Sequence, residues 1–207
     1  MSRNERRLAR KRDNFEALFA SAAARAAQGR AEEAIAIYGQ ALALRPDSAP
    51  AHNNLGIAYR ALNRFAEAAA QFKAAIAHDP QLAEVHNNLA GVLVTLGQTD
   101  GAIAHYHRAV AIKADYLEAR IGLATCYADR KQVVEALSHA EIASWQSENP
   151  SFPHFRFGVL MARCNCNDLA RKCLETYLAH DPDERQGARA LLSKLGFTSL
   201  PQQASAA

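Results

Sequence analysis

The chain has 207 residues, of which 49% are hydrophobic and only 7% are aromatic, and its formal net charge is +3. This length suits one domain or one short solenoid. No apolar run approaches the roughly 18 residues of a membrane span, and no apolar segment follows the charged N-terminus as in a secretory signal, so we expect a cytoplasmic protein with no membrane partner.

Residues 1–14 form a basic leader with six basic and two acidic residues, so the positive charge of the chain is concentrated here. One interpretation is a solvated helical extension ahead of the first repeat. The other is an electrostatic arm for nucleic acid or an anionic surface. The leader has no aromatic residue that could stack on a base, which favours the first interpretation.

Residues 15–184 carry an internal repeat with a period of 34 residues, seen in Ala34, Ala68, Ala102, Ala136 and Ala170. The period divides this segment into 15–48, 49–82, 83–116, 117–150 and 151–184. Small residues such as Gly56 and Ala68 allow two helices to touch, and large apolar residues three or four places away fill the space beside them. A single helical hairpin cannot bury its own apolar face, so the pattern predicts five stacked hairpins.

Turn residues separate the two helices that we expect in each repeat. These are Gly29, the pair Asn63 and Arg64, Gly97, the run 130–132 and the run 165–167. After the last repeat, one face of a further helix at 185–196 would carry Ala188, Leu191, Leu192 and Leu195. We expect this helix to cap the open end of the stack and residues 197–207 to form a flexible tail.

The second repeat shows its pattern most clearly in Leu55, Gly56, Tyr59, Ala68, Phe72, Ala75 and Pro80. This pattern resembles the tetratricopeptide repeat, and the similarity covers roughly residues 15–184. The resemblance implies an all-α fold, a right-handed α-solenoid of about five helical hairpins, that acts as a scaffold for binding other proteins. The basic leader is similar to the short basic starts of bacterial repeat proteins.

In this family the first helix of each hairpin lines the concave surface, which implies a set of inward-facing residues. The candidates are Asn53, Asn54, Ile57, Asn87, Asn88, Ile121, Thr125, Phe155 and Val159. Asn54 and Asn88 are one period apart within a duplicated HNNL sequence. An asparagine amide has both a donor and an acceptor, so this pair could hold a peptide backbone.

The asparagine pair is similar to two rungs of the asparagine ladder in the superhelical repeats of O-linked N-acetylglucosamine transferases. The alternative is that both asparagines are solvated or cap local backbone. Phe155 and Val159 would take an apolar side chain or a partner helix, or would pack against the capping helix.

No motif in the chain supports catalysis or metal binding. Most histidines follow the repeat period, as His52 and His86 do, which indicates roles in packing or at the surface. Cys164 and Cys166 lack the spacing of a zinc site, and the four cysteines are expected to be reduced thiols. There is no glycine-rich phosphate loop or nucleophile elbow. We therefore expect no enzyme, no cofactor, no metal and no small-molecule substrate.

The main prediction is an adaptor that binds a peptide segment or partner helix in its concave groove. A first alternative is a regulatory subunit of a separately encoded glycosyltransferase or methyltransferase. A second alternative is binding to nucleic acid or an anionic surface through residues 3–12, which the missing aromatic residues do not favour. The sequence leaves open whether the chain forms a homo-oligomer.

Overall fold

The computed structural model describes residues 2–146, 155, 157–159, 161, 162, 166–180 and 185–196. Within these ranges the chain consists of helices and their connections, with no strand. The chain divides into two compact units, residues 1–114 and 115–207. The expected turn at Asn165 and the expected tail at 197–207 lie outside the described residues.

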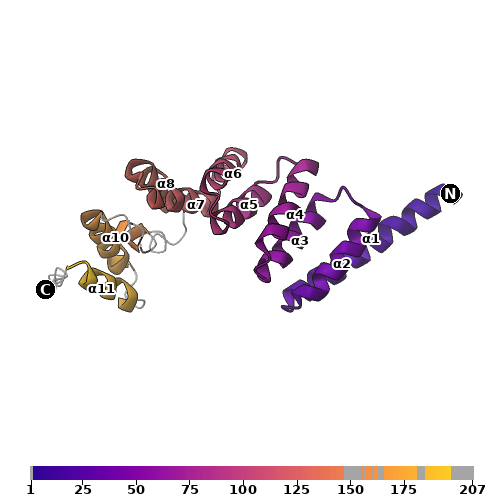
Figure 1. Cartoon of the computed structure of the whole chain (residues 1–207), viewed down its shortest axis with the longest axis horizontal. Coiled ribbons are helices and arrows are strands. Elements are labelled where there is room, and N and C mark those ends of the chain that lie inside the picture. Colours follow the sequence, from indigo (N-terminus) through magenta and orange to yellow (C-terminus); the bar gives the residue numbers. More distant parts are fainter. Residues whose placement is uncertain are drawn as a thin grey trace. The chain divides into compact units, whose positions relative to one another are not determined.

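The first unit is built from three helical hairpins (Figure 1). Its helices are α1 (Arg3–Ala27), α2 (Ala31–Leu44), α3 (Ala49–Ala61), α4 (Phe65–His78), α5 (Ala83–Thr95) and α6 (Thr99–Ile112). The pairs α1–α2, α3–α4 and α5–α6 pack together, α2 also packs on α3, and α4 packs on α5. Because α3 also contacts α1 and α5, the first helices of successive hairpins lie next to one another.

The hairpin turns share one backbone conformation at positions that are one period apart. Gly29, Asn63, Gly97 and Lys131 have φ angles of 75°, 58°, 74° and 61°. In each turn, the N–H of the next residue donates to the carbonyl five residues earlier, as Arg30 does to Arg25 at 3.0 Å. This is the Schellman arrangement that ends a helix through a left-handed residue. The four turns therefore fall where the sequence predicts them.

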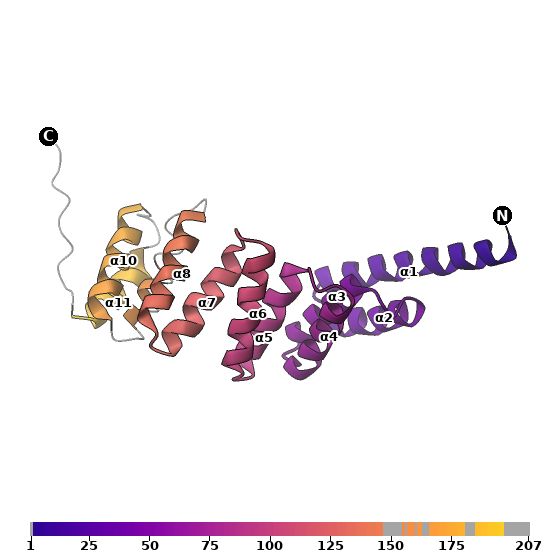
Figure 2. The ribbon, with the colours of Figure 1, turned by 90° about the horizontal axis from the view of Figure 1, so that it is seen from above.

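Helix α1 is 25 residues long, whereas α2 has 14, so its first turns extend beyond α2 in both views (Figure 1, Figure 2). A capping box begins the helix: the Glu5 N–H donates to Ser2 Oγ at 3.2 Å, and the Glu5 carboxylate accepts from the Ser2 N–H. The basic leader is thus helical and continuous with the first hairpin. Leu8 in this extension is 67% exposed.

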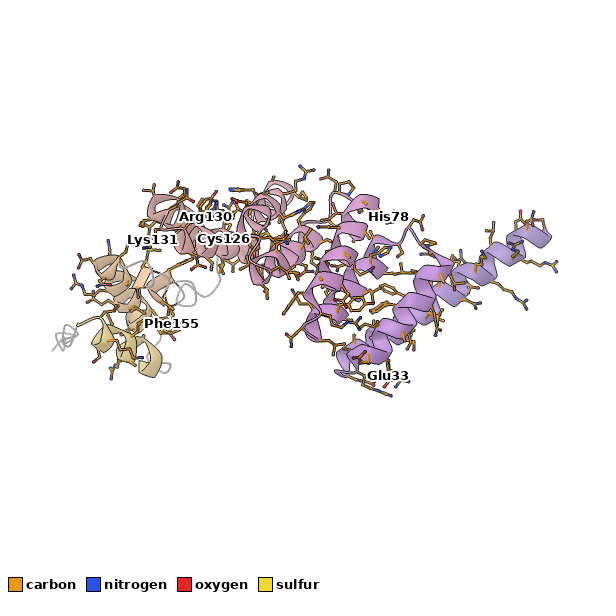
Figure 3. All side chains as sticks on the ribbon, viewed as in Figure 1. Glu33, His78, Cys126, Arg130, Lys131 and Phe155 are labelled. Carbon is orange, nitrogen blue, oxygen red and sulfur yellow. The ribbon has the colours of Figure 1, made fainter. Side chains whose placement is uncertain are left out.

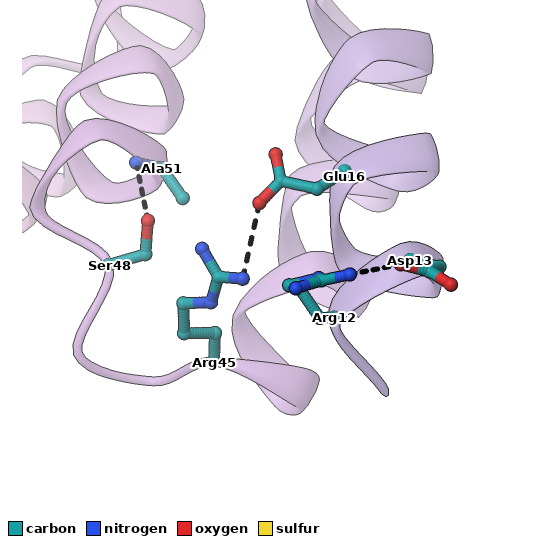
Figure 4. A network of polar contacts seen from close by, with 6 residues as sticks. All are labelled: Arg12, Asp13, Glu16, Arg45, Ser48 and Ala51. Carbon is teal, nitrogen blue, oxygen red and sulfur yellow. Dashed lines mark hydrogen bonds and ion pairs between the residues drawn. The ribbon is translucent and has the colours of Figure 1, made fainter. Parts of the chain in front are cut away.

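Arg45 ties α1 to the connection between α2 and α3 (Figure 4). Its guanidinium donates to the Glu16 carboxylate at 3.1 Å and lies over the Phe15 ring, 3.8 Å from the ring centroid. Phe15 is itself buried. Next to this contact, Ser48 Oγ accepts from the Ala51 N–H at 3.4 Å and caps α3. The polar contacts fix where α3 begins relative to α1.

The two helices of the second hairpin approach closely at Gly56. A Cβ atom at this position would lie 2.7 Å from the nearest atom of the Phe72 ring, which is fully buried. Gly158 in the second unit stands in the same relation to Leu174, at 2.5 Å. The close contact that the sequence predicts at these small residues is therefore present in both units.

The second unit contains α7 (Leu117–Asp129), α8 (Val133–Gln146), α10 (Asn167–His180) and α11 (Arg185–Lys194). Its main core joins α7 and α8 to buried residues further along the chain, including Phe157, Met161 and Ala170. On α11, Ala188 and Leu192 are buried with Leu174 and Tyr177 of α10. The helix at the end of the chain thus covers an apolar face of the helix before it.

Candidate functional site

Four polar side chains from α3 and α5 form one hydrogen-bonded row. Asn88 Nδ2 donates to Asn53 Oδ1 at 3.2 Å, and Asn53 Nδ2 donates to Glu84 Oε1 at 3.4 Å. At the other end, Arg60 Nη1 donates to Asn88 Oδ1 at 3.3 Å. We call Glu84, Asn53, Asn88 and Arg60 the α3–α5 row.

The direction of every hydrogen bond in the row is set by its charged ends. Arg60 can only donate, so Asn88 must present its oxygen to Arg60 and its nitrogen to Asn53. Asn53 must then accept from Asn88 with its oxygen and donate its nitrogen to Glu84, whose ionised carboxylate can only accept. The orientation of both amides therefore follows from chemistry.

The middle of the row is buried and its ends are exposed. Asn53 and Asn88 are each 7% exposed, whereas Arg60 and Glu84 are exposed. A primary amide has two N–H donors and two acceptor lone pairs, and the row uses one donor and one acceptor of each asparagine. Each amide therefore retains one N–H and one lone pair for a further partner, and its orientation is already fixed.

Asn54 has a different role from Asn88, although the two are one period apart. Its side chain interacts with the hydroxyl of Tyr38, a buried residue of α2. Burial raises the pKa of Tyr38, and the interaction with Asn54 opposes that rise. Asn54 thus supports the packing of α2 against α3. The neighbouring candidates Ile57 and Asn87 are half-buried.

The candidates in the second unit contact residues of their own unit. Ile121 is buried in the core formed with α8, and Thr125 Oγ1 donates to the Ile121 carbonyl at 2.8 Å. Phe155 (Figure 3) packs against Tyr177 with 5.1 Å between ring centroids, in the cluster that includes α11. This is the packing role that the sequence left as the alternative for Phe155. Val159 is half-buried.

Two histidines in successive repeats make the same connection. His52 contacts the Pro46 carbonyl at 2.9 Å and Gln71 at 2.8 Å. One period later, His86 contacts the Pro80 carbonyl at 3.3 Å and His105 at 2.9 Å. Each histidine joins the end of the preceding repeat to the second helix of its own hairpin.

The pair of rings in the later repeat has a defined protonation pattern. The Pro80 carbonyl can only accept, so His86 Nε2 carries the proton and His86 Nδ1 accepts from His105 Nδ1. Burial lowers the pKa of both histidines. The hydrogen bond to the Pro80 carbonyl opposes this shift for His86, whereas Arg108 lowers the pKa of His86, and His86 and Lys73 lower that of His105. The pair is therefore held in its neutral form.

The cysteines that the structure describes in the second unit are buried or half-buried. Burial raises the pKa of Cys126 to about 11 and raises that of Cys173 as well. In the part of the chain that the structure describes, no three His, Cys, Asp or Glu residues are placed to hold a metal ion. No helix among the described residues combines the length and the apolar character needed to cross a bilayer.

Sequence reasoning missed Arg60 and Glu84, which complete the row, and Gln71 and His105, which complete the histidine connections. The spacing of the second pair was a usable signal, because Gln71 and His105 are one period apart, as are His52 and His86. Arg60 gave no such signal, since the residue one period after it is valine, whereas Glu84 is followed one period later by Glu118.

The hairpins, their left-handed turns and the small residues at their contacts define an all-α protein of the helical-repeat class. A family model described as tetratricopeptide repeat matches residues 25–92, 60–104 and 93–143. The chain belongs to the tetratricopeptide repeat family, whose members are generally scaffolds for protein interactions.

Solved structures of other repeat proteins resemble this chain. YrrB, described as a TPR protein with an unusual peptide-binding site, is 26% identical, with a TM-score of 0.68 over 81% of this chain and 86% of YrrB. PilF of Pseudomonas aeruginosa is 18% identical, with a TM-score of 0.74 over 90% of this chain and 84% of its own. A tetratricopeptide repeat protein from Parabacteroides merdae is 16% identical, with a TM-score of 0.77 over 89% of this chain and 75% of its own.

These matches show the α-solenoid fold and include bacterial members of the family. No curated protein sequence matches the chain significantly. The similarity to O-linked N-acetylglucosamine transferase repeats is not shown by these comparisons and stays a prediction.

Proposed function

We propose that this protein is a non-catalytic adaptor that binds an extended peptide segment of a partner protein across the α3–α5 row. The observation that carries the proposal is the pair of buried, mutually bonded amides of Asn53 and Asn88, with Asn87 and Ile57 beside them on the same two helices. From the sequence, Asn54 and Asn88 were expected to hold a peptide backbone. In the proposed site this role belongs to Asn53 and Asn88.

The chemistry of the row suits a peptide backbone. Each peptide unit offers one N–H and one C=O, and each asparagine of the row retains one donor and one acceptor. The hydrogen bonds within the row hold the amides in place before a ligand arrives, so less side-chain freedom is lost on binding. Backbone contacts of this kind give affinity that is independent of the ligand's own side chains.

The comparison with YrrB supports the peptide class of ligand. YrrB is described as having a peptide-binding site, and it shares 26% of its residues with this chain over most of both lengths. Its ligand class is therefore a reasonable model for this chain, while the residues that would contact the peptide are argued from the α3–α5 row alone.

The adaptor proposal is tested by selecting ligands from a random-peptide display library on the immobilised full chain. Affinity for the selected peptides is then compared between wild type and the double variant Asn53→Leu, Asn88→Leu, which keeps the branched shape of both side chains but removes their polar groups. Gln40→Leu, at an exposed position of α2, serves as the control.

We expect the double variant to lose at least about tenfold in affinity, since two or more hydrogen bonds of about 1 kcal/mol each are removed. The Gln40 variant should bind as wild type does, and circular dichroism should show all three to be equally helical. Equal affinity of the double variant and wild type would contradict the proposal.

The exposed basic turns of α1 favour a second candidate function, binding to a polyanion. Arg6, Arg7, Arg10 and Lys11 are all exposed in a helix that projects beyond α2. Binding of the full chain to double-stranded DNA, measured at several salt concentrations with and without residues 2–12, tests it. A steep loss with salt that disappears with the deletion would support this function; equal weak binding by both forms would refute it.

A further inference from the structure

Building on the proposed function, we infer that Arg60 and Glu84 make the α3–α5 row selective for a peptide with an acidic side chain at one end and a basic side chain at the other. The acidic side chain lies against Arg60 and the basic one against Glu84. The inference names the class of ligand for the site proposed above, and it rests on that proposal.

The two charges are available to a ligand. Both side chains are exposed, and each has only a neutral asparagine as its hydrogen-bond partner in the row. Among residues 2–146, neither Arg60 nor Glu84 takes part in an ion pair. By contrast, Arg45 and Arg64 are each paired with a carboxylate. A ligand charge would therefore meet an unneutralised partner at either end.

The repeat fold does not require an arginine at position 60. The equivalent residues of the next two repeats are Val94 and Ala128, and both are compatible with their helices. Arg60 therefore stands as an addition to the scaffold in the second repeat, next to the buried amide of Asn88. A charge that packing does not require, placed at the end of an ordered polar row, is a candidate determinant of specificity.

The length of the row sets the spacing of the ligand charges. Glu84 is the second residue of α5 and Arg60 is the twelfth of α3, so the two lie ten helical positions apart along neighbouring helices. At 1.5 Å per residue this is about 15 Å. An extended peptide advances roughly 3.3 Å per residue, so the complementary charges fall about four or five residues apart.

The polarity of the row makes a charge-swapped variant feasible. In Arg60→Glu, Glu84→Arg the acceptor and the donor change ends, and rotation of both amides by about half a turn restores every hydrogen bond. The variant therefore keeps the buried amides bonded. A neutral variant, Arg60→Gln, Glu84→Gln, removes both charges and retains polar ends.

The experiment selects peptides from the same random library separately on the full-length wild type, the swapped variant and the neutral variant. Wild type should enrich peptides with an acidic and a basic residue four or five positions apart, and the neutral variant should show no such preference. A wild-type peptide should bind the swapped variant about tenfold more weakly, and high salt should shrink the difference.

A second peptide, with its acidic and basic residues exchanged, is tested on wild type and on the swapped variant. Compared with the original peptide, it should bind the swapped variant more tightly and wild type more weakly. Peptides that are enriched without this charge spacing, or affinities that the swap leaves unchanged, would overturn the inference while leaving the peptide-binding function standing. Failure to enrich any peptide would overturn both.

Discussion

The Asn88 side chain donates to the Asn53 side chain at 3.2 Å, across 35 residues of sequence. The repeat period is 34 residues, so the contact joins positions that are not equivalent in their repeats. Asn53 and Asn88 are both buried, and each also bonds a charged residue. The pair therefore couples the first helices of two successive hairpins through polar groups that are largely removed from water.

Removing both members of this pair should cost less than the two single removals added together. Asn53→Leu leaves the Asn88 N–H unsatisfied in a buried site, and each single variant should lose about 1–3 kcal/mol of unfolding free energy. The double variant Asn53→Leu, Asn88→Leu leaves no orphaned amide between the helices and should lose less than the sum of the singles. Urea denaturation of the four forms measures the coupling, and strict additivity would show that the two amides act independently.

Adding one methyl group at Gly56 should destabilise the protein. The new Cβ would lie 2.7 Å from the Phe72 ring, which is fully buried, so overpacking should cost about 1–3 kcal/mol. Gly39, in the middle of α2, has nothing within 4 Å of its Cβ position. Gly39→Ala should therefore gain about 0.5–1 kcal/mol from helix propensity alone. Thermal or urea unfolding of the two variants should move in opposite directions.

Lys131 stores backbone strain that glycine should relieve. Its φ angle is 61°, a left-handed conformation that costs an L-residue about 1–2 kcal/mol, and Gly29 and Gly97 occupy the equivalent turns. Lys131→Gly should stabilise the second unit by about 1 kcal/mol. Lys131→Ala keeps the same strained backbone and should give no gain. If both variants change the unfolding midpoint equally, the side chain and not the backbone is responsible.

Stability should fall as the pH drops below about 6.5, the pKa of an unperturbed histidine. Burial holds the folded pKa values of His86 and His105 below this value, so the unfolded chain takes up protons first. The contribution of the neutral pair is fully present above the unfolded pKa and is lost progressively at lower pH. His105→Gln copies the His52–Gln71 connection of the preceding repeat and removes one titrating group.

The urea midpoint of that variant, followed from neutral to mildly acidic pH, should depend on pH less steeply than wild type. An unchanged slope would place the pH dependence elsewhere in the chain. Arg108, which lowers the pKa of His86, is common to both forms, whereas the effect of Lys73 on His105 disappears together with that histidine.

The repeat period was enough to predict the turns of the first four hairpins. Gly29, Asn63, Gly97 and Lys131 are spaced at the period and all adopt the left-handed conformation that ends a first helix. Gly56 was predicted to be a close contact because small residues recur at its column, and the Phe72 ring lies against it. These features follow from local geometry that is repeated in every unit, so they can be found from one sequence.

The partners of the asparagines could not be predicted in this way. Adjacent residues of a helix point about 100° apart, so whether Asn53 or Asn54 faces α5 depends on how α3 is rotated in its packing. In the structure Asn53 faces Asn88, and Asn54 interacts with Tyr38 instead. Arg60 and Glu84 join the row only because of that rotation. The extents of the five predicted repeats stay a prediction, since parts of the last two lie outside the described residues.

The most direct test of peptide binding on the α3–α5 row is an NMR titration of the full chain with a library-selected peptide, following the side-chain amide signals of asparagine and glutamine. We predict that the signals of Asn53 and Asn88 shift with the peptide, while that of Gln40 on α2 does not. Unchanged Asn53 and Asn88 signals, accompanied by shifts on α2, α4 or α6, would contradict it and place the binding surface on the other side of the hairpins.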